Sequence, residues 1–223
     1  MRDCDAIVDL WYPGDMGGHA LADVLFGRVS PAGRTTQTWY QSDETMPKQG
    51  LMTMRPAGDS PGWTYRYHNK KPAIPFGFGL SYTEFTYSAL TLSAAAPADP
   101  CAPIGVNVTV TNVGKVDSDE VVQCYIKQPN ASTAPQVRLA DFARVHIKAG
   151  QSSVVSLTIA PKEQALVVGS TGVYQPNLIV PKGIVEVHVG GGQPDFYAGS
   201  VMTTVEIVKD GKLTRSYECA ENQ

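Results

Sequence analysis

The 223-residue sequence has no long apolar run, no basic stripe and only four cysteines. A membrane-spanning helix needs about 20 consecutive apolar residues, so we expect no membrane partner. Lysine and arginine number 18 against 21 aspartates and glutamates, and both signs are spread along the chain. A nucleic-acid-binding surface requires clustered basic groups, so we expect no nucleic-acid partner either.

The start of the chain also lacks a targeting pattern. Residues 1–15 read MRDCDAIVDLWYPGD, without the basic, apolar and small-residue order of a secretory signal. A strand-like run begins within a few residues of Met1. Natural domains usually begin with a cap or a short tail, so we expect a chain cut from something longer or a gene model that begins late.

The cysteines have no CxxC pairing and no metal-ligand spacing, so we expect neither a metal nor another cofactor. Cys124 lies in an apolar strand-like run and is predicted to be a small buried hydrophobic residue. Cys101 and Cys219 lie near the two ends of a predicted β-sandwich. A disulfide between them would require an oxidising compartment, and the sequence leaves both the bonded and the free state open.

The first 40 residues have a sequence pattern typical of an α/β fold. Residues 4–12 form an apolar run predicted to be a buried strand, and a glycine-rich turn follows it. Leu21, Val24 and Leu25 fall at helical spacing before Gly27, which predicts a helix over 17–26. Residues 35–40 are predicted to be a short strand. The order strand, turn, helix is typical of α/β domains, which place ligands at such turns.

Residues 41–80 are rich in proline and glycine and show little apolar periodicity. We therefore predict an irregular segment, which in a compact protein is usually functional or wraps another domain.

From about residue 84 the sequence alternates between apolar and polar residues in short runs. This pattern predicts about seven strands, no helix and an all-β sandwich. The side chains predicted to share the inner faces are Ile104, Val106, Val108, Val110, Val122, Cys124, Ile126, Val155, Leu157, Ile159, Val185, Val187 and Val189.

Three ordered stretches resemble glycoside hydrolase family 3. YPGDMGGHALADVLFGRVSPAGR (12–34) is similar to the signature near the end of the family's second domain, and YRYHNKKPAIPFGFGLSYTEF (65–85) to the exit from that domain. VTVTNVGKVDSDEVVQCYIKQP (108–129), with the runs at 139–152 and 180–192, resembles the family's fibronectin type III-like module. LADFARV (139–145) departs from the family, which more often has a glycine and a charged residue around the phenylalanine.

The resemblance implies a multidomain fold, α/β plus all-β. Residues 1–80 would be the C-terminal remnant of an α/β sandwich domain, and residues 81–218 an immunoglobulin-like, fibronectin type III-like β-sandwich. The parent would be an exo-acting β-glycosidase of β-xylosidase or β-glucosidase type, and residues 52–67 are closer to xylosidase-like and plant-type members.

The resemblance also implies that this chain lacks the catalytic carboxylates. Retaining glycosidases use a nucleophile and an acid/base. In the family the nucleophilic aspartate lies on an N-terminal barrel domain, and the glutamate acid/base lies upstream of the glycine-rich turn. We therefore expect residues 1–223 alone to be inactive, to support the catalytic domains structurally and to expose an apolar surface that meets the barrel. The parent enzyme is expected to be secreted.

Four residues are candidates for binding β-linked saccharides. Asp15 would face the catalytic cleft from the glycine-rich turn, although the favoured interpretation is an N-cap of the helix over 17–26. Trp63, Tyr65 and Arg66 belong to an aromatic loop whose rings could stack on sugars. The alternative, which we favour, is that these side chains pack the domain against its neighbours.

Two Asn-x-Ser/Thr triplets make Asn107 and Asn130 candidates for glycosylation if the protein is secreted. A second functional hypothesis is a non-catalytic module that binds carbohydrate or protein through the loops of the sandwich.

Overall fold

The computed structural model describes residues 4–48, 50, 53–93, 98–129, 134–170, 176–214 and 216–220. Its helical elements are all short: α1 (Gly17–Leu25), η1 (Asp43–Thr45), α2 (Thr64–Tyr67) and α3 (Pro161–Gln164). The strands follow α2 in the chain: β1 (Phe85–Leu92), β2 (Ile104–Asn112), β3 (Ser118–Lys127), β4 (Arg138–Ile147), β5 (Ser152–Ile159), β6 (Leu166–Ser170), β7 (Pro176–Val180), β8 (Gly183–Gly190), β9 (Val201–Ile207) and β10 (Gly211–Leu213).

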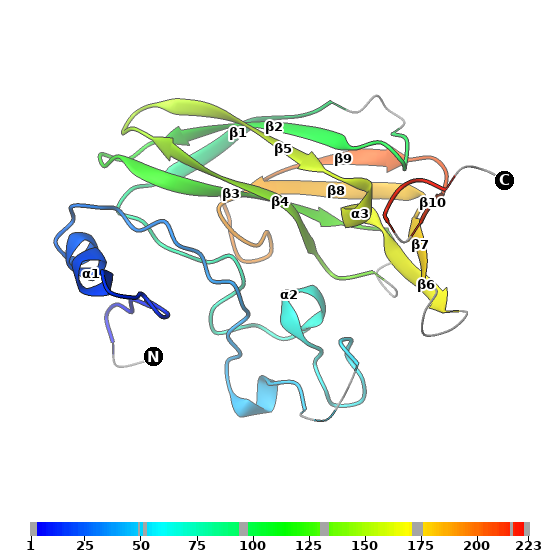
Figure 1. Cartoon of the computed structure of the whole chain (residues 1–223), viewed down its shortest axis with the longest axis horizontal. Helices are drawn as coiled ribbons and strands as arrows, with labels where there is room; N and C mark the ends of the chain where they lie inside the picture. Colours follow the sequence, from blue (N-terminus) through cyan, green and yellow to red (C-terminus); the bar gives the residue numbers. More distant parts are fainter. Residues whose placement is uncertain are drawn as a thin grey trace.

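Two antiparallel sheets form a sandwich. One has the order β1-β2-β5 and the other β4-β3-β8-β9, so together they contain the seven strands that the alternation predicts. Figure 1 shows the two sheets stacked, with the N-terminal segments along one side. The mixed α/β and all-β fold class is confirmed.

A third small sheet, β10-β7-β6, was not predicted. It lies at the far end of the sandwich, near α3 (Figure 1). Its strands have only three to five residues, which is too short for an alternating pattern to stand out in the sequence. The helical turn α3, which begins with Pro161, was also missed because one turn has no periodicity.

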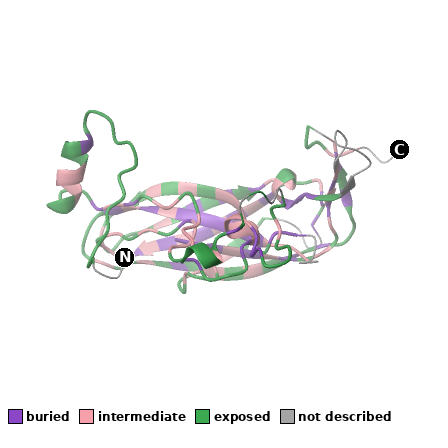
Figure 2. Cartoon of the chain, turned by 90° about the horizontal axis from the view of Figure 1, so that it is seen from below, coloured by how far each residue is buried: buried purple, intermediate pink, exposed green. Residues whose placement is uncertain are grey.

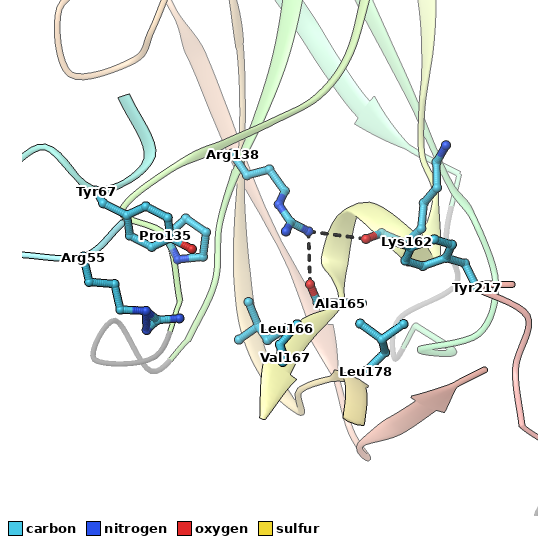
Figure 3. Close-up of a pocket in the computed structure, with 10 residues that line it drawn as sticks. All are labelled: Arg55, Tyr67, Pro135, Arg138, Lys162, Ala165, Leu166, Val167, Leu178 and Tyr217. Atoms are coloured by element: carbon cyan, nitrogen blue, oxygen red, sulfur yellow. Dashed lines mark hydrogen bonds between the residues drawn. The ribbon is translucent and has the colours of Figure 1, made fainter. Parts of the chain in front are cut away.

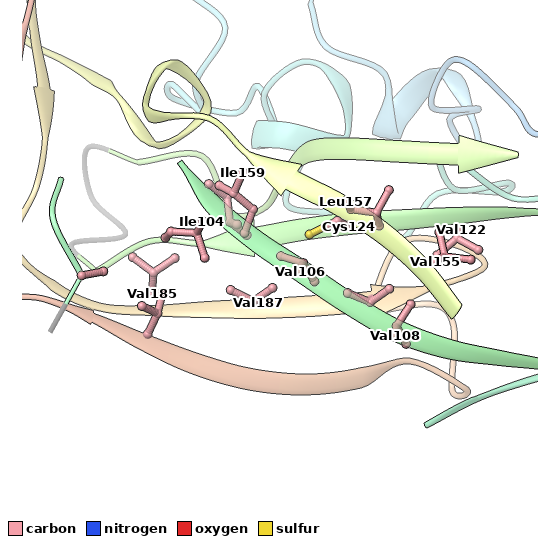
Figure 4. Close-up of a cluster of buried hydrophobic side chains, with 14 of the residues drawn as sticks. Ile104, Val106, Val108, Val122, Cys124, Val155, Leu157, Ile159, Val185 and Val187 are labelled. Carbon is pink, nitrogen blue, oxygen red and sulfur yellow. The ribbon is translucent and has the colours of Figure 1, made fainter. Parts of the chain in front are cut away.

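The core lies between the two main sheets and confirms the predicted inner faces. Strand β2 alternates strictly between buried and half-buried residues. Figure 4 shows the buried side chains of β2, β3, β5 and β8 gathered between the sheets. Cys124 is fully buried among them, as predicted, and burial raises the pKa of its thiol to about 12. The thiol is therefore protonated and behaves as a small apolar group.

The Cys101–Cys219 disulfide is present, with Cα atoms 5.6 Å apart. It ties the loop before β2 to the residues after β10. Of the two states that the sequence leaves open, the structure has the bonded one.

The predicted buried strand over 4–12 is wrong. These residues are irregular, and Ile7, Trp11 and Tyr12 are exposed, Tyr12 to 96%. A strand needs a neighbour for its backbone hydrogen bonds, and no strand in the described part of the chain pairs with this segment. The apolar composition that predicts burial is real, but no segment within the described residues covers these side chains.

Helix α1 confirms the predicted helix over 17–26 to within one residue. It ends before Gly27, which has a φ of +72° and donates its N–H to the Val24 carbonyl over 3.0 Å. Figure 2 shows this helix standing clear of the sandwich, with little of it buried.

An N-terminal apolar surface is therefore exposed around α1, as expected for this chain. We use this name for the exposed side chains of Ile7, Val8, Leu10, Trp11, Tyr12, Met16, Leu25, Phe26 and Val29.

Residues 35–40 do not form the predicted strand. Trp39 makes an isolated antiparallel bridge with Ile74, and the Thr35 N–H donates to the Phe78 carbonyl over 2.8 Å. Pro72 and Pro75 flank Ala73 and Ile74 and have no N–H to donate, which disfavours a longer ladder. The described part of 41–80 is otherwise irregular, as predicted, apart from η1 and α2. None of the helices in the described ranges has the length and apolarity to cross a lipid bilayer.

Candidate functional site

A buried polar cluster joins the N-terminal segments to the sandwich. Arg34 extends from the SPAGR turn, and its Nη2 lies 2.7 Å from Oε2 of Glu120 on β3. The side chains are only 11% and 2% exposed. Arg34 Nε also donates to the Gly191 carbonyl over 3.2 Å, and the Tyr87 hydroxyl donates to Glu120 Oε1 over 2.6 Å. We call Arg34, Glu120, Tyr87, Gln123 and Gly191 the joint.

The pKa values of Glu120 and Tyr87 depend on burial and on their partners in the joint. Burial raises the pKa of Glu120, whereas the Arg34 charge and the Tyr87 hydrogen bond lower it. Burial and the nearby Glu120 charge raise the pKa of Tyr87 well above its ordinary value, so its hydroxyl stays protonated and donates. Each carboxylate oxygen of Glu120 thus has a partner, which makes the pair a fixed connection rather than an open reactive group.

Gln123 extends the joint to the residues before β1. Its Nε2 donates to the carbonyls of Gly77 and Gly191, each over 3.0 Å, and its Oε1 accepts from the Tyr125 hydroxyl over 2.6 Å. Gly77 has a φ of +76°, and a Cβ there would collide with Gln123 Oε1. The glycine therefore allows the backbone to approach the sheet closely.

Gly79→Ala is expected to lower the free energy of unfolding by about 1–3 kcal/mol. A Cβ at Gly79 would collide with the Gly33 carbonyl oxygen and lie 3.0 Å from the Arg34 side chain, so it would push residues 33–34 away from the sheet. Urea denaturation measures the change. Gly33→Ala is the matched control, since its Cβ would meet nothing within 4 Å, and a loss as large as that of Gly79→Ala would contradict the close approach.

Asp15 is exposed in the turn before α1 and does not cap it. The N-cap is Met16, and no side chain makes a cap hydrogen bond, so the favoured N-cap interpretation is wrong. The physical reason is the tight turn at 14–17, in which the Gly17 N–H donates to the Gly14 carbonyl over 3.2 Å. The helix therefore begins one residue too late for Asp15. Its proposed contact with substrate stays a prediction.

Tyr65 packs against the sandwich. Its ring stacks on Phe76 with centroids 4.1 Å apart, and its hydroxyl accepts from the Leu139 N–H over 3.1 Å. Trp63 precedes α2 and donates its N–H to the Met54 carbonyl over 2.8 Å. The Tyr65 contacts agree with the packing alternative.

Arg66 is held by its backbone, whose carbonyl accepts from the Gln136 N–H over 2.8 Å. Its Nε is buried and has no hydrogen-bond partner within the described ranges. Sugar contact by Trp63, Tyr65 and Arg66 stays a prediction. Figure 1 shows α2 well apart from α1, so the structure does not bring this loop together with Asp15.

The structure describes only one of the two glycosylation candidates. Asn107 is half-buried on the outer side of β2, where its Oδ1 accepts from the Ser156 hydroxyl over 2.6 Å. Asn130 lies outside the described residues. Glycosylation at both stays a prediction.

Sequence reasoning missed the joint. One signal was present: Glu120 occupies the inward phase of its strand together with Val122 and Cys124, where a charge requires a partner. Nothing local identifies that partner, since Arg34 lies 86 residues earlier. In the part of the chain that the structure describes, no three His, Cys, Asp or Glu side chains gather in a way that would hold a metal ion.

Family models match both parts of the chain. Residues 1–82 match the glycosyl hydrolase family 3 C-terminal domain, and residues 120–193 match the fibronectin type III-like domain.

Individual proteins agree with these models. The chain is 38% identical over 158 residues to a xylan 1,4-beta-xylosidase of Xylanibacter ruminicola, covering 71% of the chain and 17% of the relative. It is 37% identical over 174 residues to a beta-glucosidase of Rhizobium radiobacter, covering 72% and 21%. Beta-glucosidase 3B from Thermotoga neapolitana in complex with glucose superposes with a TM-score of 0.77 at 28% identity, covering 95% of this chain and 29% of that one.

The chain thus spans about a fifth of the length of these curated relatives. The segment that matches the glycosyl hydrolase family 3 C-terminal domain comes first, and the fibronectin type III-like sandwich follows it. This is the order that the three motifs indicate. The chain therefore belongs to glycoside hydrolase family 3 and corresponds to the C-terminal part of its members.

Proposed function

We propose that this chain is the C-terminal portion of an exo-acting β-glycosidase of β-xylosidase or β-glucosidase type, in which it supports the catalytic domains. The observation that carries the proposal is the joint. Its buried Arg34–Glu120 pair fixes the family 3 domain piece to a sandwich with its own complete core. A rigid sandwich is a suitable base for loops that must be positioned precisely relative to another domain.

The N-terminal apolar surface supports the same role. Large exposed apolar patches on soluble domains usually mark interaction sites. Around α1, nine large apolar side chains are exposed on a segment matched by the family 3 C-terminal domain. We infer that the rest of this domain and the barrel domain cover it, and that these domains are the partners of the chain.

The substrate of the whole protein would be a β-linked xyloside or glucoside. The relatives are named as a xylan 1,4-beta-xylosidase and a beta-glucosidase, and both names support a β-glycoside. We propose a secreted parent enzyme, which the Cys101–Cys219 disulfide supports because such bonds persist in oxidising compartments.

The test compares two proteins: the product of the complete reading frame that contains this sequence, and residues 1–223 alone. We expect the complete product to hydrolyse p-nitrophenyl β-D-xyloside or β-D-glucoside, and residues 1–223 to show no hydrolysis above the buffer rate. Hydrolysis by residues 1–223 that a carboxylate substitution abolishes would contradict the supporting role. Strong retention of an inactive complete product on insoluble xylan or cellulose would favour the binding module instead.

A further inference from the structure

His68 is a buried histidine at the end of α2. The residue is only 7% exposed, and its Nδ1 lies 3.2 Å from the carbonyl oxygen of Gly62 in the turn before the helix. A carbonyl oxygen only accepts, so Nδ1 carries the proton and donates it. Nε2 is then the acceptor nitrogen of a neutral imidazole, and it is buried without a hydrogen-bond partner in the described ranges.

The surroundings of His68 disfavour a positive charge on its ring. Burial lowers the pKa of His68, and the charge of Lys70 lowers it further, while the hydrogen bond to Gly62 opposes both. Tyr40 packs edge-on against the ring, with centroids 4.8 Å apart. A proton added to Nε2 would therefore lie in a buried place, with a cation nearby and without an acceptor.

Two other histidines show the contrast. His146 Nδ1 lies 2.7 Å from Asp119 Oδ1, and His188 Nε2 lies 3.0 Å from Glu186 Oε2. Each therefore has a carboxylate that stabilises a proton on its ring. In the part of the chain that the structure describes, no carboxylate pairs with His68.

The His68 ring lies where α2 is connected to the preceding segments. The His68 N–H donates to the Thr64 carbonyl over 2.9 Å, and the Asn69 N–H donates to the Pro61 carbonyl over 3.0 Å, which closes the segment 61–69 on itself. The Tyr40 hydroxyl accepts from the Thr64 N–H over 3.2 Å. Tyr40 therefore holds both ends of α2, through its hydroxyl at the start and its ring at His68.

Helix α2 also docks on the sandwich at the start of β4. The carbonyls of Arg66 and Tyr67 accept from Gln136, over 2.8 Å from its backbone N–H and 3.2 Å from its Nε2. Figure 3 shows Tyr67 next to Pro135 in the lining of a pocket of about 180 Å³ between α2, β4, α3 and the small sheet. Loosening of α2 would thus open one wall of this pocket and move the aromatic loop that carries the saccharide-binding candidates.

We propose that His68 is a pH-sensitive switch for the docking of α2: the neutral ring holds the helix against Tyr40 and the sandwich, and protonation of Nε2 releases it. Release requires only local opening of the segment 61–69, because the sandwich has its own core.

The direction of the pH dependence follows from the two states of His68. In the released segment the ring is in water and has the ordinary pKa of 6.5, which is higher than its pKa in the docked segment. The released form therefore binds more protons below this pH. Docking is complete above about pH 6.5 and weakens as the pH falls through the lowered pKa of the docked form.

Amide hydrogen exchange of the full chain at about pH 7.5 and about pH 5 tests the proposal, with rates expressed as protection factors so that the intrinsic pH dependence of exchange cancels. The probes are the N–H groups of Trp63, His68 and Asn69, which are hydrogen-bonded within or next to the segment. We expect their protection to fall at least about tenfold at the lower pH, since one pKa unit corresponds to that factor. Amides of β2 and β3 should keep their protection.

His68→Asn removes the titration and keeps the hydrogen bond, because the amide nitrogen of asparagine reaches the position of histidine Nδ1 and donates to Gly62. We expect this variant to have the same protection at both pH values. His19→Asn is the matched control, since it makes the same change at an exposed histidine on α1 and should behave as wild type. Circular dichroism verifies that each variant is folded.

Titration of the imidazole protons of the wild type by NMR is a second measurement, and it needs no variant. We expect His68 to titrate at a lower pH than the exposed His19, together with the loss of protection in 61–69.

Four outcomes would overturn the proposal. One is wild-type protection of 61–69 that stays constant as the pH falls. Another is an acid-induced loss in His68→Asn as large as that in the wild type. The third is titration of His68 at or above the pH at which His19 titrates. The fourth is an equal loss of protection in β2 and β3, which would show that acid opens the whole chain rather than α2.

Discussion

Glu120→Ala is expected to lower the free energy of unfolding of the chain by about 3–5 kcal/mol. The substitution leaves the Arg34 guanidinium, which is only 11% exposed, without its carboxylate, and it leaves the Tyr87 hydroxyl without an acceptor. An uncompensated buried charge costs much more than a lost surface pair. The loss should be accompanied by faster amide hydrogen exchange at 30–34 and 77–83, the segments that the joint holds to the sheet.

Urea denaturation measures the free energy, and Asp23→Ala is the control. Asp23 pairs with Arg28 over 3.3 Å at the surface, with side chains 40% and 78% exposed. Loss of this pair should cost under about 1 kcal/mol. If Glu120→Ala costs no more than Asp23→Ala, the joint does not hold the two parts of the chain together.

Cys219→Ser is expected to cost about 3–5 kcal/mol under oxidising conditions. The Cys101–Cys219 bond spans 118 positions of sequence, and a crosslink that closes so long a loop removes much of the entropy of the unfolded chain. The bond also anchors the end of the small sheet, where Leu213 is buried and bridges to Cys219.

Thermal denaturation of the oxidised chain, with titration of free thiols, measures this effect. Cys4→Ser is the control, because Cys4 is exposed and outside the disulfide. Reduced wild-type protein should match Cys219→Ser within error. Equal stability of oxidised wild type and Cys219→Ser would contradict a stabilising disulfide.

The sandwich was predictable because the alternation of apolar and polar residues within each strand is a local feature of the sequence. Alternation in β2, β5 and β8 assigns each side chain to one face, and the buried residues of those strands are the predicted ones. The ordered motifs then identify the family without any knowledge of three-dimensional contacts. Helix α1 was predictable for the same reason, since its apolar spacing and the following Gly27 are adjacent in sequence.

The site was harder to predict because its contacts are long-range. Arg34 and Glu120 are 86 residues apart, and the pocket collects side chains from Arg55 to Tyr217. The sequence favours packing for Tyr65 but does not identify its partners, which are the Phe76 ring and the backbone N–H of Leu139 on β4. Residues 4–12 show the opposite error, since an apolar run predicts burial only where something is present to cover it.

The central claim is that this chain supports a family 3 glycosidase through its joint. Reconstitution of the enzyme from two parts tests this claim most directly. Residues 1–223 would be mixed with the separately produced remainder of the complete reading frame, and hydrolysis of p-nitrophenyl β-D-xyloside and β-D-glucoside would be followed. We predict that activity appears only with both parts and is reduced when the Glu120→Ala chain replaces wild type. Full activity of the remainder without residues 1–223 would contradict the claim.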